Sequence, residues 1–366
     1  MNKLIFFFAA ILLFASCMEP DSVEPQELVE TEDIYFPGIN NDEWETLEMD
    51  TLGWRTEHVN DLYNFLEENN TRAFIVLKDG KIVMEEYWGQ TILGIGDFNA
   101  GSQWYWASAG KTITSSLVGI AQDDGLLDIT DPSSMYLGEG WTSMSTEQEN
   151  QITIRDQLTM STGVDYEILN TGCTDPECLT YRADPGTQWF YHNATYTLLD
   201  GVIKNATGSD LNEYTDEKFQ STIGMNGEWI NLNINNVYWS TARDMARFGL
   251  LIMNEGKWVD EQVIPSDYYN EMVNTSQDLN PAYGYLWWLN GKSSIVLPDL
   301  PTSFEGALAS QAPSEIFAGL GKNGQFVDIY PSENIVVIRM GEAPEESLVP
   351  TSFHNDMWGL IMDVIE

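Results

Sequence analysis

The residues with the clearest chemical potential are Ser108 and Lys111, which form the only Ser-x-x-Lys motif of this chain. Ile113, Leu117 and Ile120 recur at helical spacing after them, so the pattern predicts a helix that begins here. Positions three apart share a helix face, and a lysine in a dry pocket loses its proton more easily. A neutral amine could then activate the serine, and the helix N-terminus could stabilise an oxyanion. The alternative is that Ser108 only caps the helix and that Lys111 is exposed to solvent.

Two further residues could act on the same proton: Tyr191 and Asn193, between an Asp-Pro-Gly turn at 184–186 and an apolar helix. A phenol can carry a proton, and a carboxamide can hold both a lysine amine and a substrate. A packed tyrosine beside a capping asparagine fits as well, and Tyr268 and Asn270 have the same spacing. This motif therefore indicates a catalytic site only when it is combined with the other motifs.

Lys322, Asn323 and Gly324 stand directly before a C-terminal strand that begins at Gln325. A lysine at a strand edge can supply positive charge, and a glycine lets a substrate backbone approach closely. A solvated loop lysine is the simpler alternative. The other Lys-x-Gly, at 78–80, is explained by a hairpin turn.

Strand patterns lie at both ends of the globular part, and helical patterns lie between them. We expect one hairpin from 73–77 and 82–84, a second from 325–330 and 334–339, and helices over 59–66, 196–204, 242–253 and 355–365. This order predicts an α+β fold: one antiparallel sheet formed from the N- and C-terminal segments, flanked by helices, with a mostly helical insertion. A cleft between the two parts is the expected place for a site.

The composition limits the classes of partner. The chain has 366 residues with 16 basic and 57 acidic side chains, a formal net charge of −41. Such a charge argues against nucleic acid and against attraction to anionic membranes. The hydrophobic content of 43% is that of a folded core, so the acidity indicates a heavily solvated surface suited to salty surroundings. Three scattered histidines, His58, His192 and His354, give no metal-ligand spacing.

The N-terminus has the form of a secretory signal over 1–16: a basic start, then an apolar run at 4–15 that is shorter than the about 20 residues of a bilayer span. Small residues before Cys17 resemble the bacterial lipobox, which implies lipid attachment to Cys17. An acidic tether at 17–43 would then precede a domain at 44–366. We expect an exported bacterial lipoprotein, in the periplasm or at the outer membrane or cell surface, that touches the membrane through its lipid only. A cleaved signal with an incidental cysteine is the alternative.

Cys173 and Cys178 are the remaining cysteines, separated by a segment that contains a turn-forming Asp-Pro. We expect a disulfide between them, because the turn can bring the sulfurs together and export permits such a bond; without nearby histidines they make a poor metal site. Two free thiols in a loop are the other possibility.

The three motifs occur in the order Ser108-x-x-Lys111, Tyr191-x-Asn193, then residues 322–324. Because all three motifs occur in this order, the chain resembles the serine β-lactamase and penicillin-binding protein group. Within that group it resembles the class C-like branch, which includes esterases, D-aminopeptidases and 6-aminohexanoate-oligomer hydrolases. The resemblance runs from Phe74 to the C-terminus. It includes Arg-Asp-Gln-Leu-Thr-Met-Ser-Thr-Gly at 155–163 and a helix start within 238–249.

The resemblance implies that Ser108 attacks a carbonyl to form an acyl-enzyme, with no cofactor. Lys111 and Tyr191 would shuttle the proton, and either could be the base. Asn193 would orient Lys111 and the substrate.

The resemblance also implies a binding role for 322–325. Lys322 would stabilise the Tyr191 phenolate or a substrate anion, and the backbone N–H groups of Ser108 and Gln325 would form the oxyanion hole. One departure matters: β-lactamases of this branch have Lys-Thr-Gly or Lys-Ser-Gly, whereas this chain has Asn323 before Gly324. The missing hydroxyl favours a small ester, amide or peptide substrate over a β-lactam. A class C-like β-lactamase, a D-aminopeptidase and a DD-peptidase are the alternatives.

Two rival readings remain. A Ser-His-Asp hydrolase needs a Gly-x-Ser-x-Gly elbow, but Trp106 occupies the first glycine position before Ser108. A binding lipoprotein that kept the fold and lost catalysis is the non-enzyme alternative, although all three motifs are intact. Specificity is expected in the loops at 167–182 and 291–312.

Overall fold

The computed structural model describes residues 34–232 and 235–366. The expected signal at 1–16, the lipid anchor Cys17 and the tether up to 33 lie outside the described residues. Residues 34–43, which the sequence assigned to the tether, pack against the domain instead. The Phe36 ring lies edge-on to Trp258 with centroids 5.0 Å apart, and Arg247 donates to the carbonyls of Gly38 and Asn41. The globular part therefore begins about ten residues earlier than expected.

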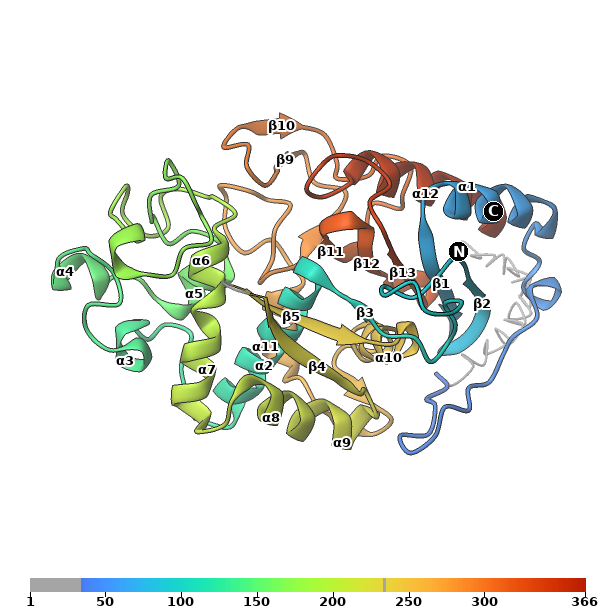
Figure 1. The fold of residues 1–366 in the computed structure, drawn as a ribbon, viewed down its shortest axis with the longest axis horizontal. Helices are drawn as coiled ribbons and strands as arrows, with labels where there is room; N and C mark the ends of the chain where they lie inside the picture. The colour runs from blue at the N-terminus through green and yellow to red at the C-terminus, as the bar shows by residue number, and fades with distance from the viewer. Residues whose placement is uncertain (1–33, 233–234) are drawn as a thin grey trace, which may run out of the picture. The chain divides into compact units, whose positions relative to one another are not determined.

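A six-stranded sheet forms the centre, in the order β2-β1-β13-β12-β11-β8 (Figure 1). Its strands, all antiparallel to their neighbours, are β1 (Thr71–Lys78), β2 (Lys81–Tyr87), β8 (Trp288–Leu289), β11 (Phe317–Gly321), β12 (Gln325–Tyr330) and β13 (Ile335–Gly341). Both terminal hairpins are confirmed. The N-terminal strand β1 pairs directly with the C-terminal β13, with Val76 opposite Val337.

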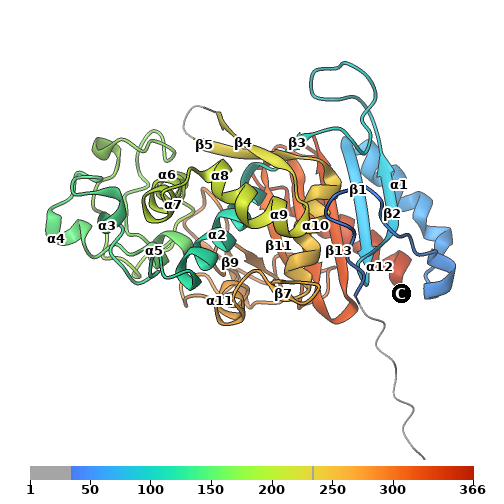
Figure 2. The same cartoon turned by 90° about the horizontal axis from the view of Figure 1, so that it is seen from below.

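Helices cover the sheet because its strands are apolar on both faces, as the nearly unbroken burial of β1 and β13 shows. Helix α10 (Ala242–Met253) packs on one face, where Gly249 permits close approach: a Cβ there would lie 2.5 Å from the Val336 side chain. Helices α1 (Val59–Glu68) and α12 (Thr351–Ile365) contact each other at the end opposite the helical insertion (Figure 2). This arrangement confirms the expected α+β fold, in which the N- and C-terminal segments form one antiparallel sheet flanked by helices.

The insertion between β2 and β11 is mostly helical. Its helices are α2 (Lys111–Asp123), α3 (Ser134–Leu137), α4 (Thr146–Glu149), α5 (Ile154–Leu158), α6 (Asn193–Thr197), α7 (Leu199–Thr207), α8 (Leu211–Thr215), α9 (Ser221–Ile223), α10 and α11 (Ser266–Met272). Helix α2 is buried from Lys111 to Ala121 and contacts both α7 and α11. It is the core helix that carries the Ser-x-x-Lys motif.

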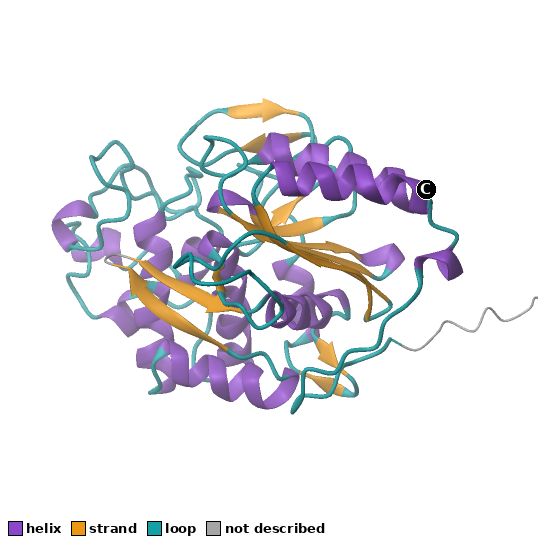
Figure 3. Cartoon of the chain, turned by 45° about the vertical axis from the view of Figure 1, so that its right-hand side comes forward, coloured by secondary structure: helices purple, strands orange, loops and turns teal. Residues whose placement is uncertain are grey.

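Short strands complete the insertion. A second sheet has three strands in the order β3-β5-β4 (Figure 3). The strands outside the central sheet are β3 (Trp104–Tyr105), β4 (Gly227–Leu232), β5 (Asn235–Ser240), β6 (Lys257–Trp258), β7 (Glu261–Gln262), β9 (Ser294–Val296) and β10 (Ser303–Glu305). Trp104 pairs with Ser240, so this small sheet holds the segment just before Ser108.

Candidate active site

Ser108 lies in a 3₁₀ turn, Ala107–Gly110, that leads directly into α2 at Lys111. Ala107 has a φ of 48°, a left-handed conformation that costs an L-residue about 1–2 kcal/mol. The buried Trp106 holds this turn, because its N–H donates to the carbonyl of Tyr238 at 2.8 Å. Strain next to a half-buried serine is typical of a functional site. The expected helix start is confirmed, with Ser108 in the turn and Lys111 as the first residue of α2.

Lys111 is the buried amine that the spacing predicts, with a side chain only 4% exposed. Its Nζ donates to Oδ1 of Asn193 at 3.1 Å, and lies 3.8 Å from the Tyr196 ring centroid and 5.3 Å from that of Tyr191. Burial lowers the pKa of Lys111 to about 7, against the opposing effect of the Asp200 carboxylate. A large fraction of this amine is therefore neutral near physiological pH and can accept a proton.

Tyr191 stands across from the serine. Its ring stacks on Trp288, with centroids 5.9 Å apart and an interplanar angle of 19°. Burial raises the pKa of Tyr191 above its ordinary value, while the nearby Ser108 hydroxyl lowers it and the Asp299 charge raises it. The phenol is consequently protonated at rest, within reach of the Ser108 hydroxyl.

Asp200, on α7, is a residue that the sequence reasoning missed. Its Oδ2 accepts from Asn236 Nδ2 at 2.6 Å, while Oδ1 is buried and finds no partner among the described residues. Burial raises the pKa of this carboxyl to about 7, against the lowering effects of Asn236 and Lys111. The available signal was an aspartate within the apolar run Leu198-Leu199-Asp200-Gly201-Val202-Ile203.

The predicted binding segment, 322–325, forms the end of the β11–β12 hairpin. Lys322 is exposed, and Asn323 adopts a left-handed φ of 64° from which its Nδ2 donates to the Tyr105 hydroxyl at 2.7 Å. Gln325 is fully buried and bonds Gly341 through both ends of its carboxamide. The Asn323 and Gln325 side chains thus have structural partners. The roles of the Lys322 charge, the Gly324 backbone and the Gln325 N–H stay predictions.

The backbone that packs most closely on the serine turn belongs to β11. A Cβ at Gly321 would lie 2.5 Å from the Trp106 carbonyl oxygen and 3.0 Å from the Ala109 nitrogen. Strand β8 pairs only with Phe317 and Ala318, so the last three residues of β11 have no strand partner on that side in the described chain. This edge was not expected. The glycines at 319 and 321 were its signal, because only such residues let a strand approach a helix turn so closely.

The predicted disulfide between Cys173 and Cys178 is confirmed, with an S–S distance of 2.04 Å. Its loop is tied to the first turn of α6, where the Ala194 N–H donates to the Thr171 carbonyl at 2.9 Å. The disulfide therefore lies in a loop that is held against the helix carrying Asn193.

Two of the histidines form hydrogen bonds elsewhere in the structure. His354 on α12 bonds the Asp328 carboxylate at 2.8 Å in the core, and Nε2 of His192 lies 3.3 Å from the Asp165 carbonyl oxygen. Neither hydrogen-bonds Ser108 in the described chain. Within residues 34–232 and 235–366, no cluster of three or more histidine, cysteine, aspartate or glutamate side chains is arranged to hold a metal ion.

Comparisons with known proteins agree on one family. Residues 70–347 match the family model described as Beta-lactamase. An uncharacterised protein of Alkalihalophilus pseudofirmus is 26% identical over 73% of this chain and 82% of its own length. The 6-aminohexanoate-dimer hydrolase of Paenarthrobacter ureafaciens is 22% identical over 83% of this chain and 80% of its own. A solved structure of a proposed 6-aminohexanoate-dimer hydrolase from Bacillus anthracis superposes with a TM-score of 0.67 at 19% identity, covering 90% of this chain and 89% of that one.

Proposed function

Because the chain belongs to the β-lactamase family, we propose that it is a serine hydrolase that forms an acyl-enzyme on Ser108 with a small ester or amide. The observation that carries this proposal is the state of Lys111: a buried amine, held by Asn193, with a pKa near 7. Such an amine one helical turn after a half-buried serine is equipped to remove the serine proton.

The proposed reaction gives each of these groups a role. Neutral Lys111 accepts the Ser108 proton while Oγ bonds to the substrate carbonyl carbon, and the carbonyl oxygen takes up the electron pair. Tyr191, protonated at rest, gives its proton to the leaving oxygen or nitrogen as that bond breaks, and regains one from Lys111. Water then attacks the acyl-enzyme through the same groups, releasing the acid and restoring the serine. The environments thus favour Lys111 as the base and Tyr191 as the proton carrier.

Two observations favour neutral or cationic esters and amides over β-lactams. The net charge of −41 repels anionic substrates, and β-lactam antibiotics carry a carboxylate. Asn323 stands where the related β-lactamases have a hydroxyl residue, and its amide is bonded to Tyr105. A linear amide with a free amino end is a second candidate, supported by the relative named 6-aminohexanoate-dimer hydrolase and by the acidity of the chain.

Hydrolysis of a short-chain p-nitrophenyl ester tests the proposal, with Ser108→Ala beside the wild type. We expect the turnover to fall by about 10³-fold or more, because the nucleophile is lost. Ser115→Ala is the matched control, since this serine lies two turns further along α2 with a buried hydroxyl, and its turnover should equal that of the wild type. Equal turnover in Ser108→Ala and the wild type would exclude Ser108 as the nucleophile.

We also propose that the protein is exported and anchored by lipid at Cys17. The disulfide supports an oxidising compartment, because such bonds are rare in the cytosol. Labelling with a tagged fatty acid in a bacterial host should mark the wild type and not Cys17→Ser, whereas equal labelling would contradict the anchor.

A further inference from the structure

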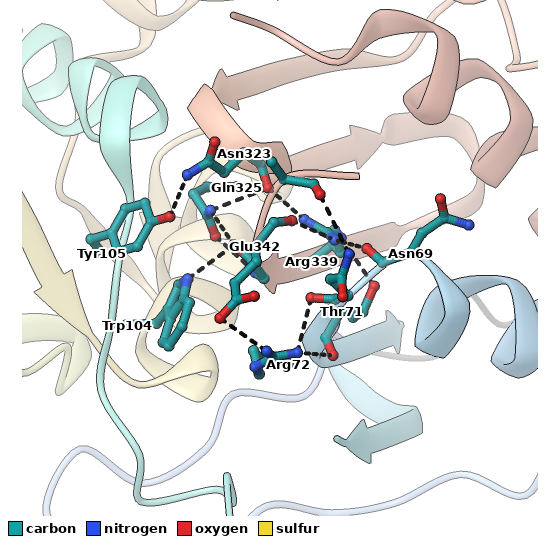
Figure 4. A network of polar contacts seen from close by, with 12 residues as sticks. Asn69, Thr71, Arg72, Trp104, Tyr105, Asn323, Gln325, Arg339 and Glu342 are labelled. Carbon is teal, nitrogen blue, oxygen red and sulfur yellow. Dashed lines mark hydrogen bonds and ion pairs between the residues drawn. The ribbon is translucent and has the colours of Figure 1, made fainter. Parts of the chain in front are cut away.

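Arg339, on β13, is a fully buried guanidinium at the centre of a polar network (Figure 4). All five of its N–H donors are used within the protein. Its acceptors are Thr71 Oγ1 at 3.1 Å and four carbonyl oxygens: Asn323 at 2.7 Å, Gly324 at 2.9 Å, Asn69 at 2.8 Å and Glu342 at 3.2 Å. Its bonds therefore tie the hairpin end at 323–324 to the beginning of β1.

None of these acceptors is a carboxylate, although the chain has 57 acidic residues. Glu342 offers Arg339 only its carbonyl, while its carboxylate pairs with Arg72 at 3.0 Å. Buried charges are ordinarily paired with an opposite charge, because desolvation is costly. A guanidinium that bonds carbonyls in place of a carboxylate fixes the positions and orientations of peptide groups.

Two of the peptide groups it fixes lie in the hairpin end beside the serine turn. Asn323 and Gly324 both have left-handed φ angles, 64° and 76°, and a Cβ on Gly324 would lie 2.5 Å from Arg339 Nη1. The Gly324 carbonyl and the Gln325 N–H belong to one peptide unit, and in a trans peptide they point in opposite directions. By holding that carbonyl, Arg339 sets where this N–H points.

The same network reaches the segment that carries the nucleophile. Asn323 donates to the Tyr105 hydroxyl at 2.7 Å, and Trp104 Nε1 donates to the Gly341 carbonyl at 3.1 Å. Trp104 and Tyr105 form β3, which is followed by Trp106 and then by the 3₁₀ turn that contains Ser108. Asn323, whose carbonyl Arg339 binds, thus bonds directly to a residue three positions before Ser108 (Figure 4).

We propose, on the basis of the serine hydrolase function above, that Arg339 is a positioning residue. It holds the β11–β12 hairpin end against the Ser108 segment, so that the hairpin backbone is oriented before substrate arrives. Its loss should slow turnover per active site and leave substrate affinity nearly unchanged, because it touches backbone groups and not the substrate.

Arg339→Lys in the full chain tests this role, with Arg247→Lys as the matched control. Arg247 is also a buried arginine, 4% exposed, and donates to the carbonyls of Ile223, Gly38 and Asn41, away from the serine. Both variants lose guanidinium–carbonyl bonds, so both should unfold at a lower temperature. Active sites are counted by labelling with a fluorophosphonate. We expect kcat per labelled site to fall by about 10²-fold in Arg339→Lys only, with KM changed less than about threefold.

Equal kcat per labelled site in Arg339→Lys and Arg247→Lys, with Ser108→Ala inactive in the same assay, would overturn the positioning role alone. Full activity of Ser108→Ala would overturn the proposed function and this inference together, so the two failures are distinguishable.

A gentler variant covers the case in which Arg339→Lys does not fold. Tyr105→Phe removes the acceptor of Asn323 and leaves the core arginine in place. We expect kcat to fall by about fivefold to tenfold, the effect of one lost hydrogen bond, and no change in Tyr87→Phe, whose hydroxyl bonds Glu85 instead. An unchanged kcat in Tyr105→Phe would contradict the inference.

Discussion

Lys111 and Arg339 are two buried cations that the fold treats in opposite ways. Their side chains are 4% and 0% exposed, and burial lowers the pKa of both, to about 7 and about 9. Among the described residues, the Lys111 amine has one hydrogen bond, to Asn193, and lies over the face of the Tyr196 ring. Arg339 has five hydrogen bonds, all to neutral oxygens.

The difference shows that the same burial leaves one cation able to react and the other charged, because a guanidinium is more basic than an amine. Desolvation penalises both charges, but each hydrogen bond to the charged form returns part of that cost. Burial lowers the two pKa values by a similar amount, so Lys111 can release its proton near neutral pH. Arg339 starts from the higher pKa of a guanidinium and stays charged, and its five hydrogen bonds make it a structural group. The type of side chain and the number of its hydrogen bonds, and not the depth of burial, distinguish a base from a structural cation in this protein.

The largest expected effect comes from Lys111→Met, which keeps the volume and removes the amine. Turnover should fall by about 10²–10⁴-fold, because the general base is lost. Stability should stay equal or rise, because an apolar side chain replaces a poorly bonded buried amine. Ester hydrolysis and thermal unfolding measure the two. A variant that unfolds far more easily than the wild type would contradict the contrast with Arg339.

Arg339→Met should have the reverse profile on stability. Five buried acceptors lose their donors, so the free energy of unfolding should fall by about 3–5 kcal/mol. Urea unfolding measures the stability of this variant and of Lys111→Met. Because methionine replaces the cation in both, the two losses can be compared directly. Equal stability of the two variants would show that the five bonds contribute nothing beyond burial.

Asp200→Asn should shift the pH dependence of the reaction. The Asp200 carboxylate stabilises the Lys111 ammonium, so its removal should lower the pKa of Lys111 further. The acidic limb of kcat/KM, which reports deprotonation of the base, should move to lower pH by about one unit. A limb that moves to higher pH, or does not move, would show that Asp200 does not act on Lys111.

The stability of the same variant supplies a second check. The pKa of Asp200 is raised in the folded protein, from 3.8 to about 7, so the folded state binds the extra proton between these values. Its contribution to stability is thus complete below pH 4 and is lost as the pH rises through about 7. Asp200→Asn should therefore gain stability relative to the wild type across that interval. If the difference in free energy of unfolding between Asp200→Asn and the wild type does not change with pH, the pKa of Asp200 is not raised.

Local patterns predicted much of the fold. The hairpins around 79–80 and 331–333, α10 at 242–253 and the helix start at Lys111 all follow from periodicity and turn residues, and each is present. Strand β11 was missed because its sequence, Phe-Ala-Gly-Leu-Gly, has low strand propensity. Its glycines are explained by packing against the Ser108 turn, which lies far away in the sequence.

Some residues of the candidate site also follow from local patterns, whereas others depend on tertiary packing. Spacing along one helical turn predicted that Ser108 lies beside Lys111, and the order of motifs suggested Tyr191 and Asn193; their roles stay predictions. Asp200, by contrast, acts on Lys111 through the packing of α7 on α2, which no local pattern encodes. The end of the tether was also misplaced, because 34–43 gains its contacts from distant groups such as Arg247.

The pairing of β1 with β13 has a consequence for how the chain is made. The apolar β1 has its sheet partner at Ile335–Gly341, which is synthesised long after β1. At a synthesis rate of about 5–20 residues per second, that partner leaves the ribosome on the order of tens of seconds later. During this interval one edge of a hydrophobic strand is open. A ribosome stalled before β13 would therefore hold a chain in which this edge of β1 has no strand partner, and the central sheet cannot close until β13 has been synthesised.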